Sequence, residues 1–499
     1  MDAGCGERHI PRIELQTMAT HDTTKTHTDF VTWPLAEWAA NLKYEDLSGE
    51  AIDSAKLYLF DSFGCALGGS QQEEVELMVE HAQALGGKRE CFVIGSHIRT
   101  DPVMASLLNA LSIRAMDYND IYWKADPAHP SDIIPAALSF CDMNAPGSEP
   151  AEIGAGKALI LGTIMGHEIE MRLAEFGEPG IREYGWHHAT ITSIASPCVA
   201  GRMLRLTAAQ IQNAIGISAA RSMCLGAVTA GKLTNMKNTV DPMATRGGVE
   251  AAMLAARGYT GPEHVIDGKE GLVHCFEKFG GRFNLDVLRR DLPTSGGDHY
   301  KILDCGMKSF PIEALSHAPL TAMMKIVAGH PRKINPEDVA EIKVEVIARA
   351  ADILGDPSKY RPTSKETADH SLPYCLAVGL IDGMVTPLQF RQERIEDPAL
   401  LPVMDKIKVV ANEEFESLFP EYQPSRVTIR LKDGTAHQQR VDVPKGDPRD
   451  PMTEEEIAVK FNALGAEVVG QEACEKLREI IMQVEGEAKL VRMLELLAK

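Results

Sequence analysis

Residues 114–132 combine carboxylate, amide and imidazole side chains at spacings that could support acid–base chemistry. The stretch reads R-A-M-D-Y-N-D-I-Y-W-K-A-D-P-A-H-P-S-D. Asp117 follows an apolar helical pattern, and His129 comes twelve positions later, so a loop can fold the two face to face. Histidine titrates near neutral pH and a nearby carboxylate tunes its pKa, which suits a general acid–base pair. A structural interpretation stays open, because Asp, Asn and Pro are common in loops and the final Ser-Asp pair could cap the next helix.

Two adjacent imidazoles, His187 and His188, follow a glycine-aromatic turn in G-W-H-H-A-T. They make a poor metal site, because neither H-x-x-x-H nor H-E-x-x-H accompanies them and adjacent side chains on a helix point apart. The alternative is a surface histidine pair beside a packed Trp186.

Three later segments carry cations and further imidazoles. Lys237 lies in K-L-T-N-M-K-N-T-V-D-P, beside a predicted helix start whose amides add partial positive charge, so it could clamp a carboxylate or an enediolate. Lys308 and His317 bound the segment K-S-F-P-I-E-A-L-S-H, and His370 and Tyr374 lie in D-H-S-L-P-Y. The alternatives are a solvated basic loop for the lysine and capping or core positions for the imidazoles.

The composition of the chain argues against some classes of binding partner. The chain has 499 residues, a net charge of −20, 44% hydrophobic and 24% charged residues, as expected for a globular protein. Such a charge argues against nucleic acid or an anionic membrane surface as partner, and an anionic substrate would need local cations. The sequence has no G-x-G-x-x-G after a strand, no P-loop, no G-x-S-x-G and no zinc-ligand spacing, so it gives little support to redox cofactor, phosphoryl-transfer or serine-nucleophile chemistry.

Cysteine usage and the N-terminal segment bear on the compartment. The ten cysteines are scattered and mostly lie in apolar runs, which predicts buried free thiols in a reducing compartment. Residues 1–28 are polar and lack the apolar core of a secretory signal, and no apolar run reaches membrane-span length. We expect a disordered tail and a cytoplasmic location, with a mitochondrial one left open.

The periodicity of apolar residues predicts a mainly α protein with an α+β part. Helical patterns dominate up to about residue 268, and they are rich in Ala, Gly and Met. After about residue 302 the patterns alternate instead, with an Asp-Gly hairpin turn. Helices are expected at 35–42, 49–64, 73–85, 102–116, 133–140, 156–175, 191–204, 207–223, 244–257, 320–328 and 372–381, and strands at 342–347, 407–410, 427–431 and 438–443.

We therefore expect a large all-α helical domain at 29–300 and a smaller α+β lid domain at 301–450. The Pro- and Asp-rich segment P-K-G-D-P-R-D-P then reads as a linker, and Thr453 opens a capping box. Helices at 451–499 are expected to return to the helical domain. A cleft between two such domains is a natural place for a small ligand.

Five segments, in order, resemble the MmgE/PrpD family: D-Y-N-D…H-P-S-D, G-W-H-H-A-T, the Lys237 segment running into A-T-R-G-G-V, K-S-F-P…S-H, and T-A-D-H-S-L-P-Y. The resemblance implies an all-α domain with an α+β lid, a homodimer, and no metal or organic cofactor. It also implies catalytic roles for Asp117, His129, His187, Lys237 and His317, and substrate-binding roles for Asn119, Lys308, His370 and Tyr374.

The resemblance implies a lyase acting on a small tricarboxylate. The gap before His129 and the H-P-S-D motif resemble the 2-methylcitrate dehydratases of the family more than its cis-aconitate decarboxylases, so dehydration of 2-methylcitrate is the first expectation. Decarboxylation of cis-aconitate to itaconate, epimerisation of a small amino-dicarboxylate and a non-catalytic helical scaffold stay open. Ile121 stands where relatives commonly carry Thr, so a hydroxyl contact to substrate is missing and the exact substrate is in doubt.

Overall fold

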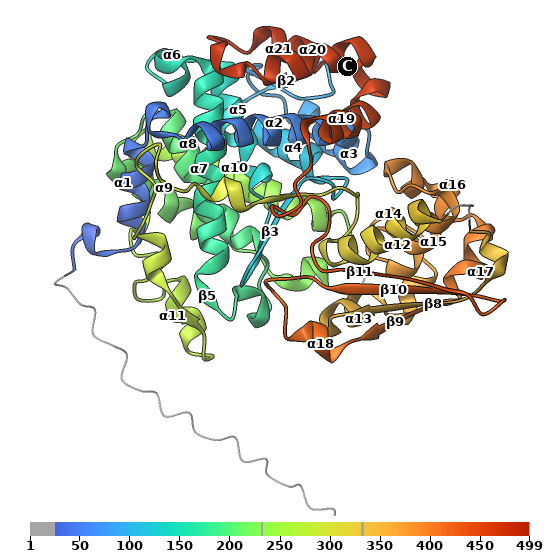
Figure 1. Ribbon diagram of the computed structural model, residues 1–499. Coiled ribbons are helices and arrows are strands. Elements are labelled where there is room, and N and C mark those ends of the chain that lie inside the picture. The colour runs from blue at the N-terminus through green and yellow to red at the C-terminus, as the bar shows by residue number, and fades with distance from the viewer. Residues whose placement is uncertain (1–24, 231–232, 331–333, 499) are drawn as a thin grey trace, which may run out of the picture.

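The computed structural model describes residues 25–230, 233–330 and 334–498 (Figure 1). Residues 1–24 of the predicted disordered tail therefore lie outside the described residues. The described chain is mainly helical, with an α+β part that follows the long N-terminal run of helices. None of the described helices combines the length and the apolar character needed to cross a membrane.

The helical part is built around four long helices that pack face to face near the site. These are α2 (Gly49–Gly69), α4 (Pro102–Arg114), α8 (Ala189–Met203) and α10 (Met236–Ala255). Close approach needs small residues: a Cβ at Gly69 would lie 1.8 Å from the Ser112 carbonyl oxygen. Around them lie α1 (Thr32–Asn41), α3 (Glu73–Leu85), α5 (Ile134–Met143), α6 (Glu149–Ile153), α7 (Ala155–Glu175), α9 (Ala208–Ala219) and α11 (Leu272–Glu277).

Within the described residues, three small sheets tie the loops of the helical part together, so this part is mainly rather than entirely helical. They pair β1 (Cys91–Phe92) with β2 (Arg99–Thr100), β5 (Gly177–Glu178) with β6 (Arg282–Phe283), and β3 (Asp120–Trp123) with β4 (Pro127–Ala128) and β7 (Gly306–Met307). Strands of two to four residues are too short to give a period-two signal in the sequence.

The α+β part is a four-stranded sheet covered by helices. The strand order is β11 (Ala436–Val441), β10 (Ser425–Leu431), β8 (Val339–Val346) and β9 (Ile407–Ala411), with β8 and β9 parallel and the other pairs antiparallel. The predicted Asp-Gly hairpin turn joins β10 to β11. Helices α12 (His317–Gly329) and α15 (Leu372–Asp382) pack together beside this sheet (Figure 1).

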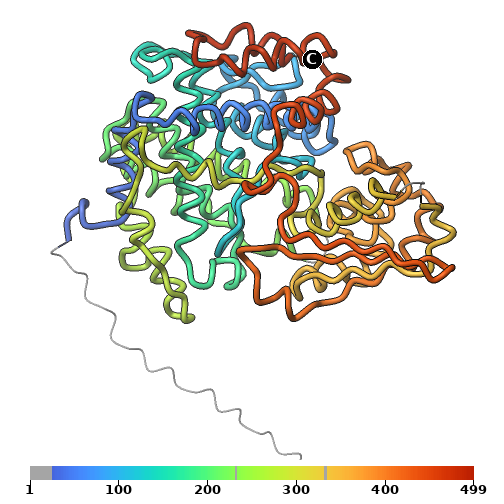
Figure 2. The backbone as a smooth tube through the Cα atoms, in the orientation of Figure 1, coloured from blue at the N-terminus to red at the C-terminus, as the bar shows by residue number. Residues whose placement is uncertain are grey.

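The two largest hydrophobic cores of the described residues lie on either side of the site. One core runs up to Met307 and resumes at Ile457, and the other runs from Ile312 to Val441. The C-terminal helices α19 (Glu454–Val469), α20 (Gln471–Ile481) and α21 (Val491–Leu496) rejoin the first core, as the red segment in Figure 2 shows. Phe461 stacks on Phe60 at 4.4 Å between ring centroids. The division into domains at residues 300 and 450 stays a prediction.

The segment expected to be a linker, residues 444–451, is packed against the strand that leads into the site. The Met307 amide donates to the Gly446 carbonyl at 2.8 Å. Gly446 has φ +95°, and a Cβ there would lie 1.9 Å from the Met307 carbonyl oxygen, so this close approach requires glycine. The segment therefore holds a fixed position beside Lys308.

The described cysteines are free and mostly buried, as the sequence predicts. Nine cysteines lie in the described residues, all of them are free, and seven are buried. Cys5 lies outside the described residues.

Candidate active site

Asp117 lies at the centre of a buried group of cations. It follows the end of α4 with φ +51°, an uncommon conformation for a residue other than glycine, and is 3% exposed. Its carboxylate lies 2.7 Å from Lys308 Nζ and 3.0 Å from Lys237 Nζ. Burial alone would raise the pKa of this carboxyl, but the two lysines lower it well below its usual value. Asp117 is therefore ionised and cannot serve as a proton donor.

The two lysines have different bonding. Lys308 directs all its hydrogen bonds inward, to the Asp117 carboxylate and to the carbonyls of Asp117 and Ile312. Lys237 lies in the first turn of α10 and is equally buried, yet its ammonium makes no hydrogen bond of good geometry, despite the short distance to Asp117. Lys308 therefore has a structural bonding pattern, whereas Lys237 can still donate to a ligand.

His129 is a neutral imidazole with a fixed tautomer. Its Nδ1 lies 2.6 Å from the Asp120 carbonyl oxygen, which can only accept, so Nδ1 carries the proton and Nε2 keeps its lone pair. Burial, and then the positive charges of Arg114 and Lys308, hold the pKa of His129 well below its usual value. His129 can thus act as a general base through Nε2.

The expectation that adjacent histidine side chains point apart is wrong here. Helix α8 begins only at Ala189, so His187 lies in the preceding loop and its ring lies 3.9 Å from that of His188. His188 Nε2 lies 3.5 Å from Asp241, and its ring lies 5.4 Å from that of His129. Both histidines are buried, which excludes a surface pair.

His188 and Asp241 are candidate site residues that the sequence reasoning did not select. A signal was available for Asp241, because it lies four positions after Lys237 on the same helix and so on the same face. Burial lowers the pKa of both His187 and His188, so these two imidazoles, like that of His129, are neutral at neutral pH.

Asn119 supports the loop that carries His129. Its amide donates to Ser131 Oγ at 2.9 Å and to Asp132 Oδ1 at 3.2 Å. The expected capping role of Ser131 and Asp132 is wrong, since α5 has no side-chain cap. Ser131 instead donates through its amide and hydroxyl to Asp120. The predicted substrate contact of Asn119 stays a prediction.

The α+β part contributes His317 and His370 to the site. His317 begins α12, and burial, together with the charge of Lys308, lowers its pKa to about 3. His370 Nδ1 lies 2.5 Å from Asp369, and the ligand atoms of these two residues lie within 4.8 Å of the Asp117 carboxylate.

Tyr374 is not brought to the cluster. Its ring is fully buried in the core of the α+β part and its hydroxyl donates to the Gln389 carbonyl at 2.5 Å. The sequence position near a helix start gave no indication that this face of α15 points into the core.

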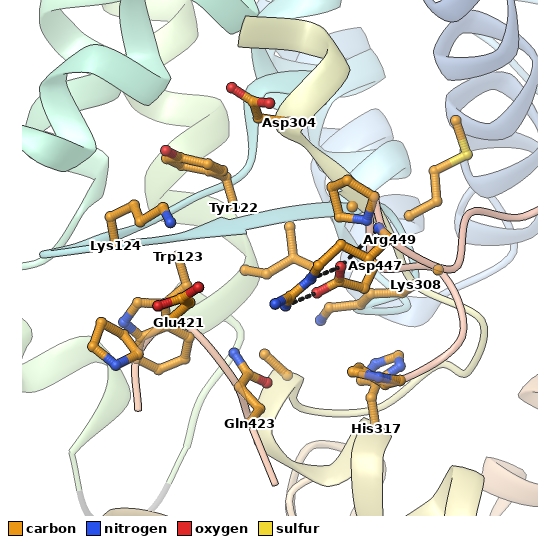
Figure 3. A pocket seen from close by; sticks show the side chains of 18 of the residues that line it. Tyr122, Trp123, Lys124, Asp304, Lys308, His317, Glu421, Gln423, Asp447 and Arg449 are labelled. Carbon is orange, nitrogen blue, oxygen red and sulfur yellow. Dashed lines mark hydrogen bonds and ion pairs between the residues drawn. The ribbon is translucent and has the colours of Figure 1, made fainter. Parts of the chain in front are cut away.

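A cavity of about 490 Å³ borders the cluster (Figure 3). Lys308 and His317 line it, together with Ile121 and Met307 of the small β3–β7 sheet. Asp447 and Arg449 of the packed 444–451 segment form an ion pair at its edge. The cavity gives a small anion a route to the Lys308 side of the cluster.

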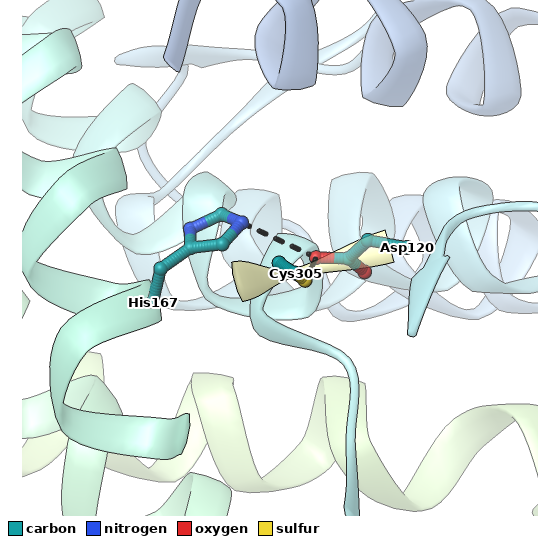
Figure 4. A group of neighbouring side chains, drawn as sticks. All are labelled: Asp120, His167 and Cys305. Carbon is teal, nitrogen blue, oxygen red and sulfur yellow. Dashed lines mark hydrogen bonds and ion pairs between the residues drawn. The ribbon is translucent and has the colours of Figure 1, made fainter. Parts of the chain in front are cut away.

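Three groups of described side chains bring possible metal-ligand atoms within 4.8 Å of one another. One of them consists of Asp120, His167 and Cys305 (Figure 4), and His167 Nε2 lies 3.3 Å from the Asp120 carboxylate. Burial raises the pKa of the Cys305 thiol well above its usual value, which opposes the thiolate that a metal needs. The other two are His187, His188 and Asp241, and Asp117, Asp369 and His370.

Family comparison decides the class of protein. The model of the MmgE/PrpD N-terminal domain matches residues 34–281, and that of the MmgE/PrpD C-terminal domain matches residues 310–485. The chain belongs to the MmgE/PrpD family. The resemblance read from the five sequence segments is thereby confirmed.

Two kinds of MmgE/PrpD relative are matched over most of their length. Cis-aconitate decarboxylase of Aspergillus terreus is 24% identical over 94% of this chain and 96% of its own, and that of Mus musculus is 25% identical over 91% of each. The mitochondrial 2-methylcitrate dehydratase of Yarrowia lipolytica is 26% identical over 83% of this chain and 79% of its own. Both names denote lyases, and this MmgE/PrpD protein is an enzyme of the lyase class.

Proposed function

We propose that the protein dehydrates a small 2-hydroxy tricarboxylate of the 2-methylcitrate type, without a metal or organic cofactor. The observation that carries the proposal is that the groups around Asp117 include a neutral His129, whose Nε2 can accept a proton, and a buried Lys237 that makes no hydrogen bond of good geometry to a described residue. Dehydration of such a substrate needs a base, a proton donor and fixed positive charge for an enediolate-like transition state.

Side chains of the described residues can supply the base, the proton donor and the positive charge. His129 Nε2 removes the proton beside a carboxylate, while Lys237 binds that carboxylate and stabilises the negative charge that develops on it. The departing hydroxyl needs a proton, and a buried carboxyl can hold one at neutral pH: burial raises the pKa of Glu170 to about 8. The apolar side chain of Ile121 in the cavity lining suits a methyl substituent better than a hydroxyl.

Decarboxylation of cis-aconitate is the second candidate. The relatives named cis-aconitate decarboxylase match a larger share of this chain than those named 2-methylcitrate dehydratase. That reaction uses nearly the same groups, with a proton delivered to carbon after carbon dioxide leaves. A homodimer, as the family resemblance implies, is proposed for either reaction.

Incubation of the purified protein with 2-methylcitrate, citrate and cis-aconitate, followed by proton NMR, tests the proposal. We expect 2-methylcitrate to yield an unsaturated tricarboxylate and no carbon dioxide. Conversion of cis-aconitate to itaconate with release of carbon dioxide, and no reaction of 2-methylcitrate, would establish the second candidate instead. No reaction with any of the three would overturn the proposed substrate class.

A further inference from the structure

Arg114 is a buried guanidinium surrounded by three carboxylates that it does not bond. It occupies the last turn of α4 and is 3% exposed. Its nitrogens lie 3.9 Å from the Asp117 carboxylate, 3.8 Å from that of Asp132 and 4.0 Å from that of Asp241. A charge-assisted hydrogen bond is much shorter, roughly 2.7–2.9 Å. Within the described chain, Arg114 Nε and Nη1 have no hydrogen-bond partner at all.

The polar atoms around Arg114 also lack hydrogen bonds of good geometry. Asp132 Oδ2, Asp241 Oδ2 and Lys237 Nζ are buried and make none to a described residue, although Lys237 Nζ lies 3.0 Å from Asp117 and Asp241 Oδ2 lies 3.5 Å from His188 Nε2. A buried polar group left without a partner costs roughly 1–3 kcal/mol, so several at one place point to a polar ligand that would satisfy them.

The charges around Arg114 favour an anion. The ionised carboxylates of Asp117 and Asp241 are faced by three cations, Lys237, Lys308 and Arg114. Burial raises the pKa of Asp132 well above its usual value, which weakens its compensation of the guanidinium. Arg114 thus keeps both its positive charge and free donors, and a planar carboxylate matches the donors of a guanidinium.

We propose that Arg114 forms a second carboxylate subsite, which receives a substrate carboxylate other than the one bound by Lys237. This assignment rests on the proposed function, because it requires a substrate with more than one carboxylate. It makes Arg114 the residue that selects tricarboxylates over dicarboxylates.

A ligand-truncation experiment tests the subsite by binding alone. Tricarballylate has three carboxylates and no hydroxyl to eliminate, and glutarate and methylsuccinate each lack one of its carboxylates. Isothermal titration calorimetry would measure all three on the wild type, on Arg114→Met and on Arg478→Met. Arg478 is the matched control, since it pairs with Glu454 on the surface of α20.

We expect Arg114→Met to bind tricarballylate about 30-fold more weakly or worse, the scale for deleting one partner of a buried charge pair. One of the two dicarboxylates should bind the variant and the wild type equally, within about threefold, because it lacks the carboxylate that Arg114 holds. Arg478→Met should match the wild type. An equal loss of affinity for all three ligands would show that Arg114 only supports the fold, and would overturn the inference.

Two further outcomes distinguish a failure of the subsite from a failure of the proposed function and from a variant that does not fold. If wild type binds none of the three ligands, the proposed function fails and the subsite fails with it. If Arg114→Met does not fold, as judged by circular dichroism, Arg114→Lys replaces it: the charge stays but the planar donors are lost. Tricarballylate affinity should then fall at least tenfold with the affinity of one dicarboxylate unchanged, and unchanged affinity for tricarballylate would overturn the inference.

Discussion

Lys308 donates a hydrogen bond to Asp117 Oδ1 at 2.7 Å, joining the segment after β7 to the end of α4 across 191 positions of sequence. Both side chains are buried. Lys237 approaches the other carboxylate oxygen without a hydrogen bond of good geometry. The two lysines that flank one carboxylate therefore differ in their bonding: Lys308 fixes Asp117, and Lys237 is the one proposed to bind the substrate.

Lys308→Met should lower the free energy of unfolding by roughly 3–5 kcal/mol, because it removes one partner of a buried, hydrogen-bonded ion pair. Lys237→Met should cost clearly less, since that ammonium makes no hydrogen bond. Denaturant titration of both variants, followed by circular dichroism, measures the difference. Equal losses would contradict the division of roles.

Lys237→Met should lower kcat/KM by an amount on the order of 2–4 kcal/mol, comparable to deleting one oxyanion donor. Because Lys237 is proposed to hold the developing enediolate, kcat should fall as well as KM rise. Steady-state kinetics on the substrate identified by NMR measures the change in kcat and the change in KM separately. A variant with wild-type kinetics would transfer the role to Lys308.

His129→Ala should lower kcat by roughly a hundredfold or more, the usual effect of losing a general base. In the wild type, the base has a pKa held well below its usual value by burial. The neutral form therefore persists as pH falls through 6.5, and kcat/KM should stay flat there, declining only at lower pH. A kcat/KM profile that falls with a midpoint near 6.5 would contradict this assignment, provided that circular dichroism shows the protein folded.

Exhaustive dialysis against EDTA should leave turnover unchanged, because the proposed reaction uses only imidazole, carboxyl and ammonium groups. The test can give either result, since three groups of described side chains could hold a metal ion. Loss of turnover, restored by zinc or iron, would mean that one of these groups binds a catalytic metal.

Local sequence signals predicted much of the fold. The helix expected at 73–85 is α3, the Asp-Gly turn joins β10 to β11, and Thr453 forms the predicted capping box. Each of these features depends on neighbours in sequence, such as a cap three residues from its donor or a turn between paired strands.

Features set by distant partners were not predictable in this way. Asp132 has the residue type of a cap, but it is buried beside Arg114 and Asn119, which come from the preceding helix and its loop. The stacking of His187 on His188 depends on where α8 begins. The burial of Tyr374 depends on which face of α15 meets the second core.

A crystal structure of the protein with tricarballylate tests the central claim most directly, that the Asp117 cluster binds a tricarboxylate for acid–base chemistry. The account predicts one ligand carboxylate on Lys237 Nζ, another on Arg114, and the carbon between them facing His129 Nε2. Ligand bound only elsewhere, for example among the surface residues of the 444–451 segment, would contradict it.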